Sequence, residues 1–187
     1  MATLSHLIKN AERITLDNDA IMAITNNQTT IAAYSELPKY DSIMDIFKQW
    51  DNFILFYETK STSCGHWVCI VYHRKANTIE LFDSYGLSDE QILRSAGTSE
   101  KLVNGVPYLT YLIKKSGSRF IYNQHRFQSL SSSVNTCGRY ASLRSRFKHL
   151  SLQRFIGILR DGNHDADYTV SALTVMYSPD IDALVGI

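Results

Sequence analysis

In Val134-Asn135-Thr136-Cys137-Gly138-Arg139-Tyr140-Ala141 a cysteine stands where a polar loop becomes a helix, and the fold can be worked out from this point. From Arg139 to His149 the apolar residues recur at intervals of three and four, which predicts one apolar helix face. Cys137 therefore lies in the first turn, where unpaired N–H groups and the helix dipole stabilise a thiolate relative to a thiol. Because cysteine is also a common small core residue, this position alone leaves a reactive and an inert interpretation open.

The composition favours one compact intracellular domain. With 187 residues and 44% hydrophobic content, the chain can bury a single well-filled core. We expect one domain over 1–187, with 1–15 as a short helix or a strand-like, loosely attached arm. The net charge of +1 argues against an overall commitment to nucleic acid or to an anionic membrane. No membrane-length apolar run or signal sequence is visible and three cysteines cannot all pair, so we expect a reducing setting and no membrane.

Apolar runs bounded by turn residues predict four strands and seven helices. The strands are expected over 53–57, 66–73, 78–83 and 119–122. The helices are expected over 20–24, 43–50, 88–95, 107–115, 139–149, 151–162 and 168–176. Asp17 is the expected N-cap of the first of these helices and Asp167 that of the last.

A hairpin predicts how two of the strands face each other. Residues 74–77 have the length and polarity of a tight turn between them. If the turn is symmetric about Lys75 and Ala76, His66 and Asp83 share a sheet face as diagonal neighbours, about 7–8 Å apart at the backbone. An imidazole and a carboxylate can meet across that distance, either in a structural hydrogen bond or as two parts of a catalytic set.

His66, Asp83 and Cys137 are the parts of a cysteine nucleophile system: an imidazolium partner, a carboxylate that fixes the imidazole tautomer, and a thiolate. They predict acyl transfer, in which Cys137 attacks a carbonyl, His66 protonates the departing amine, and water hydrolyses the thioester. The oxyanion also needs donors, and the backbone N–H of Cys137 is one candidate. A side-chain amide of the preceding loop is another; Gln128 is our first choice and Gln124 the alternative. This chemistry needs no cofactor.

A zinc site is the alternative use of the same side chains. Cys64, His66, Cys69 and Cys137 can be considered as ligands, but on a strand Cys69 points away from Cys64 and His66. No standard zinc spacing occurs, so we expect no metal.

Four sequence blocks resemble the adenovirus proteinase (adenain) and SUMO protease superfamily. In chain order they are Gly65-His66-Trp67, Leu81-Phe82-Asp83-Ser84-Tyr85-Gly86, Gln128 and Asn135-Thr136-Cys137-Gly138-Arg139. The order His, Asp, Gln, Cys separates this group from papain, where the cysteine comes first. The resemblance covers about residues 16–175 and places the chain nearest the viral, adenovirus-proteinase-like members. The chain departs from the family pattern in one respect: the loop between Gln128 and Cys137 is longer than is usual in the family.

The resemblance implies an α+β, papain-like fold with a central mixed sheet and with the nucleophile at the N-terminus of a buried helix. It implies a cysteine peptidase that cleaves peptide or isopeptide bonds after glycine. It also implies that Trp67 borders a narrow substrate groove. Strand parity instead favours Trp67 as a core aromatic on the sheet face opposite His66, and both interpretations stay open.

For the function, we expect a viral protease that processes viral precursor proteins at glycine-containing sites. The alternative is a deubiquitinase or SUMO-type isopeptidase that acts on host ubiquitin-like conjugates, whose Gly-Gly tails fit the same groove. A YopJ-like acetyltransferase and a catalytically inactive binding module rank lower. Five arginines and one lysine within 139–160 predict a solvated face, although the adenovirus relative suggests nucleic acid as an activator.

Overall fold

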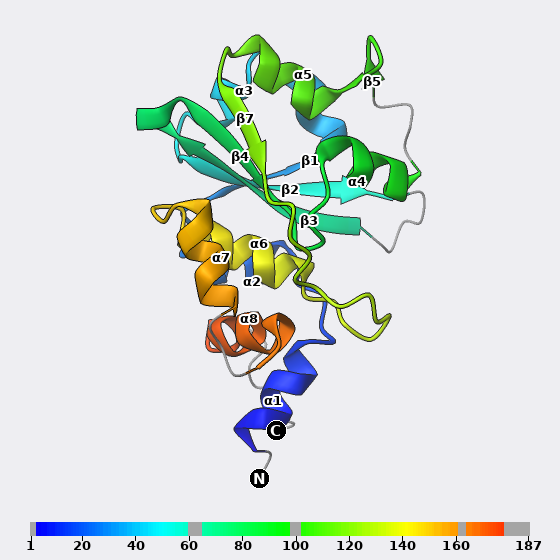
Figure 1. The fold of residues 1–187 in the computed structure, drawn as a ribbon, viewed down its shortest axis with the longest axis vertical. Helices are drawn as coiled ribbons and strands as arrows, with labels where there is room; N and C mark the ends of the chain where they lie inside the picture. The colour runs from blue at the N-terminus through cyan, green and yellow to red at the C-terminus, as the bar shows by residue number, and fades with distance from the viewer. Residues whose placement is uncertain (1–2, 60–64, 98–101, 161–163, 178–187) are drawn as a thin grey trace.

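Figure 1 shows the chain as a computed structural model that describes residues 3–59, 65–97, 102–160 and 164–177. A central sheet contains β1 (Thr30–Ala33), β2 (Asn52–Glu58), β3 (Gly65–His73), β4 (Thr78–Phe82) and β7 (Arg119–Tyr122), adjacent in that order. The pairs β1–β2 and β4–β7 are parallel, and the other two are antiparallel. The expected α+β class with a central mixed sheet is therefore confirmed. The four predicted strands are present, whereas β1 was not predicted.

The hairpin between β3 and β4 has the expected register. Ile70 faces Leu81 and Tyr72 faces Ile79. Asn77 closes the turn in the left-handed region at φ 43°, which asparagine tolerates better than most residues. Because β4 ends at Phe82, Asp83 is the first residue beyond the strand.

One face of the sheet is covered by a 3₁₀ helix, η1 (Tyr34–Lys39), and by α3 (Ile43–Ile46), α4 (Asp89–Ala96) and α5 (Tyr108–Lys115). These helices pack on the inward side chains of β2, β3 and β4, among them Leu55, Val68 and Leu81. The small hairpin of β5 (Leu102–Val103) and β6 (Val106–Pro107) precedes α5. Within this layer, α4 forms one wall of the cavity beside His66 and Cys137.

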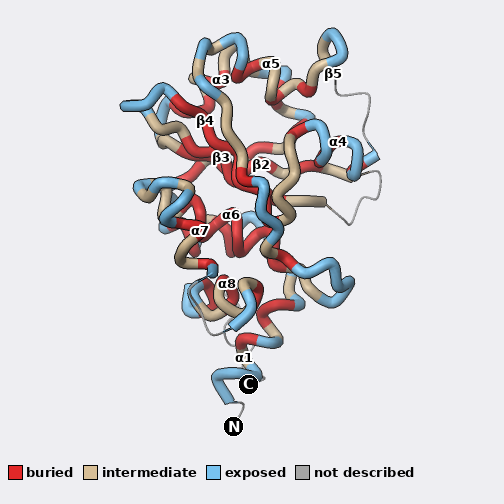
Figure 2. The backbone as a smooth tube through the Cα atoms, viewed as in Figure 1, coloured by how far each residue is buried: buried red, intermediate tan, exposed pale blue. Residues whose placement is uncertain are grey.

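The opposite face is covered by α2 (Asn18–Ile24), α6 (Cys137–Arg146), α7 (Leu152–Arg160) and α8 (Ala166–Val175). They pack on the alternate side chains of the same strands, such as Ile54 and Cys69. α6 is almost wholly buried, like the strands beside it (Figure 2). The first helix, α1 (Leu4–Ala11), lies against α8 at the end of the molecule (Figure 1). None of the helices in the described ranges is long and apolar enough to cross a membrane.

The cap of α8 differs from the prediction. Asp165, and not Asp167, is the N-cap, and its carboxylate accepts a hydrogen bond from the N–H of Tyr168 at 2.8 Å. The carboxylate of Asp167 instead accepts hydrogen bonds from the N–H of Ser129 and from the hydroxyl of Thr136. Asp167 therefore ties α8 to the loop before Cys137.

The basic run within 139–160 is only in part the solvated face that the sequence predicts: Arg154 and Arg160 are exposed, but two other arginines are buried. The side chains of Arg139 and Arg144 are fully buried. Arg144 forms a bidentate ion pair with Glu80, with N–O distances of 2.7 and 2.9 Å. Arg139 donates from Nε to the carbonyl of Ala11 at 3.0 Å. Glu80 thus compensates the buried charge of Arg144, whereas Arg139 has only a carbonyl and a hydroxyl as partners among the described residues, and its Nη2 has none.

Candidate active site

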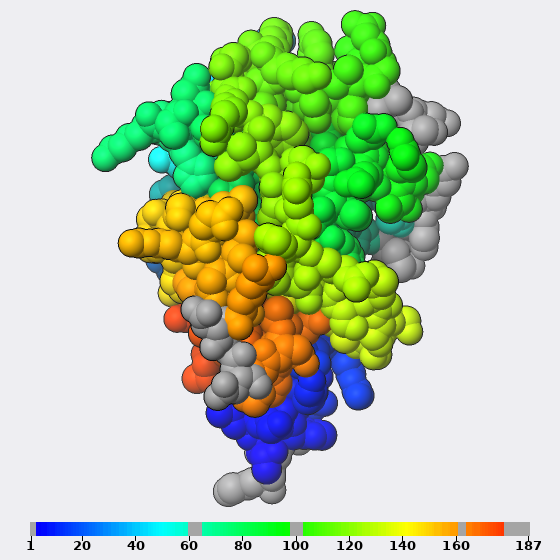
Figure 3. Space-filling view, in the orientation of Figure 1, coloured from blue at the N-terminus to red at the C-terminus, as the bar shows by residue number. Residues whose placement is uncertain are grey.

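A cavity of about 310 Å³ opens beside the start of β3, and both His66 and Cys137 line it. Its other walls come from α4 and from the loop that leads into α6, through residues such as Ile92 and Val134. On the surface, α4 (green) lies above this loop (yellow-green) in Figure 3. Apart from His66 and Cys137, the lining contains only uncharged residues, so the ionisation of that pair decides the electrostatics of the cavity.

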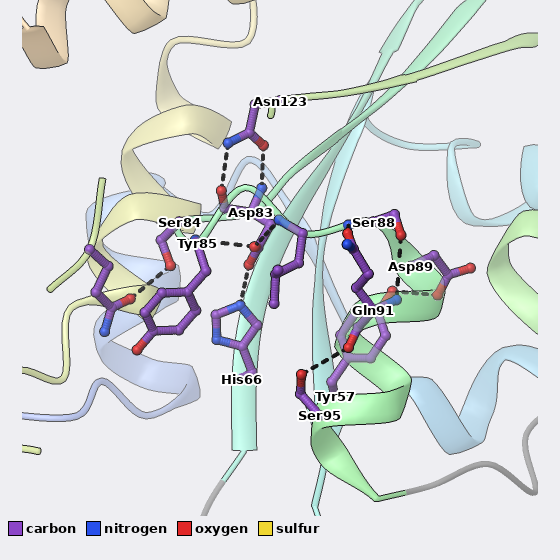
Figure 4. A network of polar contacts seen from close by, with 12 residues as sticks. Tyr57, His66, Asp83, Ser84, Tyr85, Ser88, Asp89, Gln91, Ser95 and Asn123 are labelled. Atoms are coloured by element: carbon purple, nitrogen blue, oxygen red, sulfur yellow. Dashed lines mark hydrogen bonds and ion pairs between the residues drawn. The ribbon is translucent and has the colours of Figure 1, made fainter. Parts of the chain in front are cut away.

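The carboxylate of Asp83 is held between His66 and the turn that follows β4. One oxygen accepts a hydrogen bond from Nε2 of His66, as drawn in Figure 4. The other accepts from the N–H groups of Leu87 at 2.7 Å and Tyr85 at 3.1 Å. The turn also requires Gly86, whose φ is +72° and where a Cβ atom would lie 2.7 Å from the backbone of His125. Asp83 is completely buried, and these hydrogen bonds fix the orientation of its carboxylate.

Cys137 is the first residue of α6, as predicted, and its side chain lines the cavity together with His66. Because Nε2 of His66 binds Asp83, Nδ1 is the nitrogen left for the sulfur. Burial raises the pKa of Cys137, but the hydrogen bond and positive charge of His66 and the N–H groups of Trp67 and Gly138 outweigh it and lower that pKa. Burial likewise lowers the pKa of His66, but the hydrogen bonds to Asp83 and Cys137 raise it to about 10. Both shifts favour the thiolate and imidazolium forms of the pair over the neutral forms.

The glycine after the cysteine lets the helix start approach the sheet. A Cβ atom at Gly138 would lie 3.1 Å from Cβ of Leu16 and 3.3 Å from Cδ1 of Trp67. Both distances are tighter than ordinary contacts, so a side chain here would push α6 away from β3. Gly138 thus helps to set the distance between Cys137 and His66.

Of the two glutamines considered for the oxyanion, only Gln128 lines the cavity among the described residues. Its side chain is buried, its Oε1 accepts from the hydroxyl of Ser84 at 2.7 Å, and its Nε2 donates to the carbonyl of Val134 at 3.3 Å. Since Nε2 carries two protons, one remains for a ligand. Gln124 is exposed on the loop. The geometry therefore favours Gln128.

The structure places Trp67 away from this cavity. Its indole is only 6% exposed, and its ring centroid lies 4.4 Å from that of Phe56 in the core beneath α6. Successive side chains on a strand point to opposite faces, so His66 and Trp67 diverge. Trp67 is therefore a core side chain, as strand parity favours, and the groove role implied by the resemblance stays a prediction.

One of the four side chains considered for a zinc site, Cys64, lies outside the described residues. Cys69 is buried in the core beneath α6 and is not among the residues lining the cavity. No group of three or more His, Cys, Asp or Glu side chains within the described ranges could hold a metal ion.

Two residues beside the site had no predicted role. Asn123 follows β7 directly and binds the backbone of Asp83 through its side-chain amide, as Figure 4 shows. Tyr85 stacks on the imidazole of His66, with centroids 5.3 Å apart and planes 27° from parallel. Burial raises the pKa of Tyr85 to about 12, so the phenol stays protonated. The hairpin register centred on Lys75 and Ala76 places Tyr85 opposite His66, so the sequence indicated that the two rings lie close together.

Comparison with known proteins gives one relative in sequence. No protein-family model matches the chain. The uncharacterized protein V9 of Sputnik virophage is 32% identical over 150 residues, which covers 79% of this chain and 85% of V9.

Solved structures give weaker likenesses. The C-terminal Ulp1 protease domain, solved in complex with Smt3, the yeast ortholog of SUMO, is 16% identical with a TM-score of 0.44, covering 94% of this chain and 80% of that one. The central domain of Lpg1148 from Legionella pneumophila is 13% identical with a TM-score of 0.44, covering 92% and 99%. ChlaDub1 from Chlamydia trachomatis is 11% identical with a TM-score of 0.39, covering 97% and 91%. At these scores the likenesses carry no argument about activity, for which the geometry of the site is the basis.

Proposed function

We propose that this chain, which belongs to the family of protein V9 of Sputnik virophage, is a cysteine peptidase with Cys137 as nucleophile, His66 as its acid and base, and Asp83 as the orienting carboxylate. One observation carries the proposal. Side chains from three separate elements are brought together: His66 and Cys137 line one cavity, and His66 is hydrogen-bonded through Nε2 to the buried carboxylate of Asp83. If His66 and Asp83 formed only a structural hydrogen bond, there would be no reason for a cysteine and a cavity to lie beside them.

In the proposed reaction the thiolate of Cys137 attacks the substrate carbonyl carbon, and the carbonyl electron pair moves to the oxygen. As this oxyanion collapses, the C–N bond breaks and the imidazolium of His66 gives its proton to the departing amine. A water molecule then loses a proton to neutral His66 and attacks the thioester, which releases a carboxylic acid and restores the thiolate. Gln128 and the backbone N–H of Cys137 are the proposed oxyanion donors.

For the substrate we propose a protein that is cut after glycine, with ubiquitin-like conjugates as the first class to test. The resemblance of the four sequence blocks to the SUMO protease superfamily motivates this choice. An isopeptidase and a linear peptidase use the same catalytic set, so the proposed chemistry serves both.

The second candidate is a viral precursor protein. The virophage source of V9 and the resemblance of the motif blocks to adenovirus-type proteinases support it. Nucleic acid as an activator stays a separate prediction. The burial of Arg139 and Arg144 removes two of the basic groups on which that prediction relied. Turnover that is unaltered by added DNA and by salt contradicts it.

A panel of ubiquitin, SUMO and related proteins with a C-terminal electrophile tests the substrate class. Covalent labelling of wild-type protein, with none of Cys137→Ala, supports an isopeptidase. Matched peptides that carry Gly-Gly or Ala-Ala before the scissile bond test the glycine requirement without assuming a ubiquitin-like fold. Cleavage of the Gly-Gly peptide with no labelling by any probe favours the viral precursor. No reaction with either, together with slow alkylation of Cys137 by iodoacetamide, contradicts the peptidase proposal, and consumption of acetyl-CoA identifies an acetyltransferase.

A further inference from the structure

The segment that follows α1 lies against the segment that carries Cys137. Thr15 lines the cavity together with Cys137, and Leu16 is the nearest neighbour of Gly138. These contacts join the beginning of the chain to residues more than a hundred positions away. The sequence gives no sign of them, because 1–15 shows only a short amphipathic pattern.

The backbone carbonyls of residues 11–13 accept hydrogen bonds from Asn135 and Arg139, which flank Cys137. The N–H of Asn135 donates to the carbonyl of Glu12 at 2.7 Å, and its side-chain Nδ2 donates to the carbonyl of Arg13 at 2.8 Å. Nε of Arg139 donates to the carbonyl of Ala11 at 3.0 Å. Asn135 is thus held twice, two positions before Cys137.

The end of α1 explains why these carbonyls are available. The last carbonyls of a helix have no partner within it, and they carry the negative end of the helix dipole. In this chain the partners come from Asn135 and from the guanidinium of Arg139. Arg139 is fully buried, and its only other bond within the described part of the chain goes to Thr174 on α8 at 2.9 Å. The contact therefore gives a partner to the carbonyl of Ala11 and to Nε of Arg139, while Nη2 of Arg139 has no partner in the described part of the chain.

We infer that residues 11–16 form a positioning element for the nucleophile, and that Asn135 is the residue through which they hold Cys137 against His66. The inference rests on the proposed function for its link to turnover, but its contacts are independent of the substrate. It assigns the N-terminal segment an indirect part in turnover, through the position of Cys137, so that any change that detaches α1 lowers the rate while the sheet and cavity remain.

The experiment compares Asn135→Ala and Asn135→Asp with Asn18→Ala, a change of an exposed asparagine at the start of α2. Two rates are measured in the full chain: turnover of the best substrate, as kcat and KM, and alkylation of Cys137 by iodoacetamide. For Asn135→Ala we expect kcat and the alkylation rate to fall together by about tenfold to a hundredfold, with KM unchanged, because small misplacements of a reacting group cost that much. For Asn135→Asp we expect both rates to fall at least as far, because its carboxylate cannot donate a hydrogen bond to the carbonyl of Arg13. Asn18→Ala keeps the wild-type rates.

Two outcomes overturn the inference. If Asn135→Ala keeps both rates, the segment does not position Cys137; if KM alone rises, Asn135 is a substrate contact. Should the variants fail to fold, hydrogen exchange of wild-type protein decides: the amide of Asn135 has to exchange far more slowly than that of Ser132 in the same loop, and equal rates overturn the inference. If wild-type protein turns over no substrate at all, the proposed function fails, while the alkylation and exchange comparisons still test the positioning element.

Discussion

Asn123 holds the backbone of Asp83 from both sides. Its Oδ1 accepts the N–H of Asp83 at 2.8 Å, and its Nδ2 donates to the carbonyl of Asp83 at 2.6 Å. β4 and β7 run parallel and end side by side, so the residues just beyond each strand meet. The carboxylate that orients His66 is therefore itself oriented by the neighbouring strand.

We predict that Asn123→Ala destabilises the fold by about 1–3 kcal/mol, because it leaves a buried N–H and a buried carbonyl without a partner. Turnover falls as well, since Asp83 loses its fixed position. Urea unfolding measures the first effect and kcat the second. In an Asp83→Ala background, Asn123→Ala should have much less effect on kcat, because residues in one network are not additive. An equal loss of kcat in both backgrounds contradicts an action through Asp83.

The three residues of the proposed triad should differ in the size of their effects. Cys137→Ala abolishes turnover while the fold persists, because alanine fits the first turn of a helix. His66→Ala lowers kcat more than Asp83→Ala, because the carboxylate orients the imidazole but transfers no proton. Thermal unfolding and kcat of each variant check this, with Cys69→Ala as a buried cysteine control. Unfolding of all three variants with equal loss of rate points to a structural cluster.

Cys137 should react as a thiolate at neutral pH. Alkylation by iodoacetamide falls only as the pH drops through the lowered pKa of Cys137, below the usual value of 9.0 for a thiol. Cys69, whose pKa burial raises, stays unreactive over the same range. In His66→Ala the main group that lowers the pKa of Cys137 is gone, so alkylation at pH 7 slows. At the alkaline end, turnover declines as the pH rises through the pKa of His66, about 10, because neutral imidazole cannot protonate the amine. Equal alkylation rates for Cys137 and Cys69 at pH 7 contradict the ion pair.

Local signals predicted the parts of the site that depend on local geometry. The short turn between β3 and β4 sets the register that places His66 near Asp83. The periodicity after Cys137 places it at the start of α6. Both follow from residues close together in the sequence, where turn and helix geometry leave few alternatives.

Other features depend on contacts that no local pattern shows. A run of arginines looks the same whether it is solvated or buried, and Arg144 is buried because Glu80, on a distant strand, neutralises it. Asn123 gains its role only because β7 pairs in parallel with β4. β1 is a four-residue strand whose partner lies about twenty residues on, so its short pattern does not distinguish it from a loop. These features can be recognised only once the tertiary structure is known.

Gln128 should contribute to turnover through the oxyanion alone. Gln128→Ala removes one donor, and loss of such a donor costs about a hundredfold to a thousandfold in kcat. KM and the alkylation rate of Cys137 should change little, because neither depends on the oxyanion. Gln124→Ala on the exposed loop is the matched control and keeps the wild-type kcat. A larger loss in Gln124→Ala than in Gln128→Ala reverses the assignment.

Glu80 and Arg144 form an ion pair in which both side chains are fully buried. Burial raises the pKa of Glu80, but its hydrogen bonds to Arg144 and His73 outweigh burial and lower that pKa below the usual 4.5. A carboxylate with a lowered pKa contributes stability that is present above its unfolded pKa and is lost as the pH falls through its folded pKa. Glu80→Gln should therefore cost about 3–5 kcal/mol at pH 7, because it leaves the charge of Arg144 buried without its partner.

Urea unfolding at several pH values tests this dependence. The difference in free energy of unfolding between wild-type protein and Glu80→Gln should shrink as the pH falls below 4.5, because wild-type Glu80 then also loses its charge. Glu90→Gln is the matched control, since Glu90 pairs with Arg94 across exposed side chains and such pairs contribute about 0–1 kcal/mol. A difference that stays constant from pH 7 to the acid limit of the fold shows that the carboxylate charge is not what stabilises the core beneath α6.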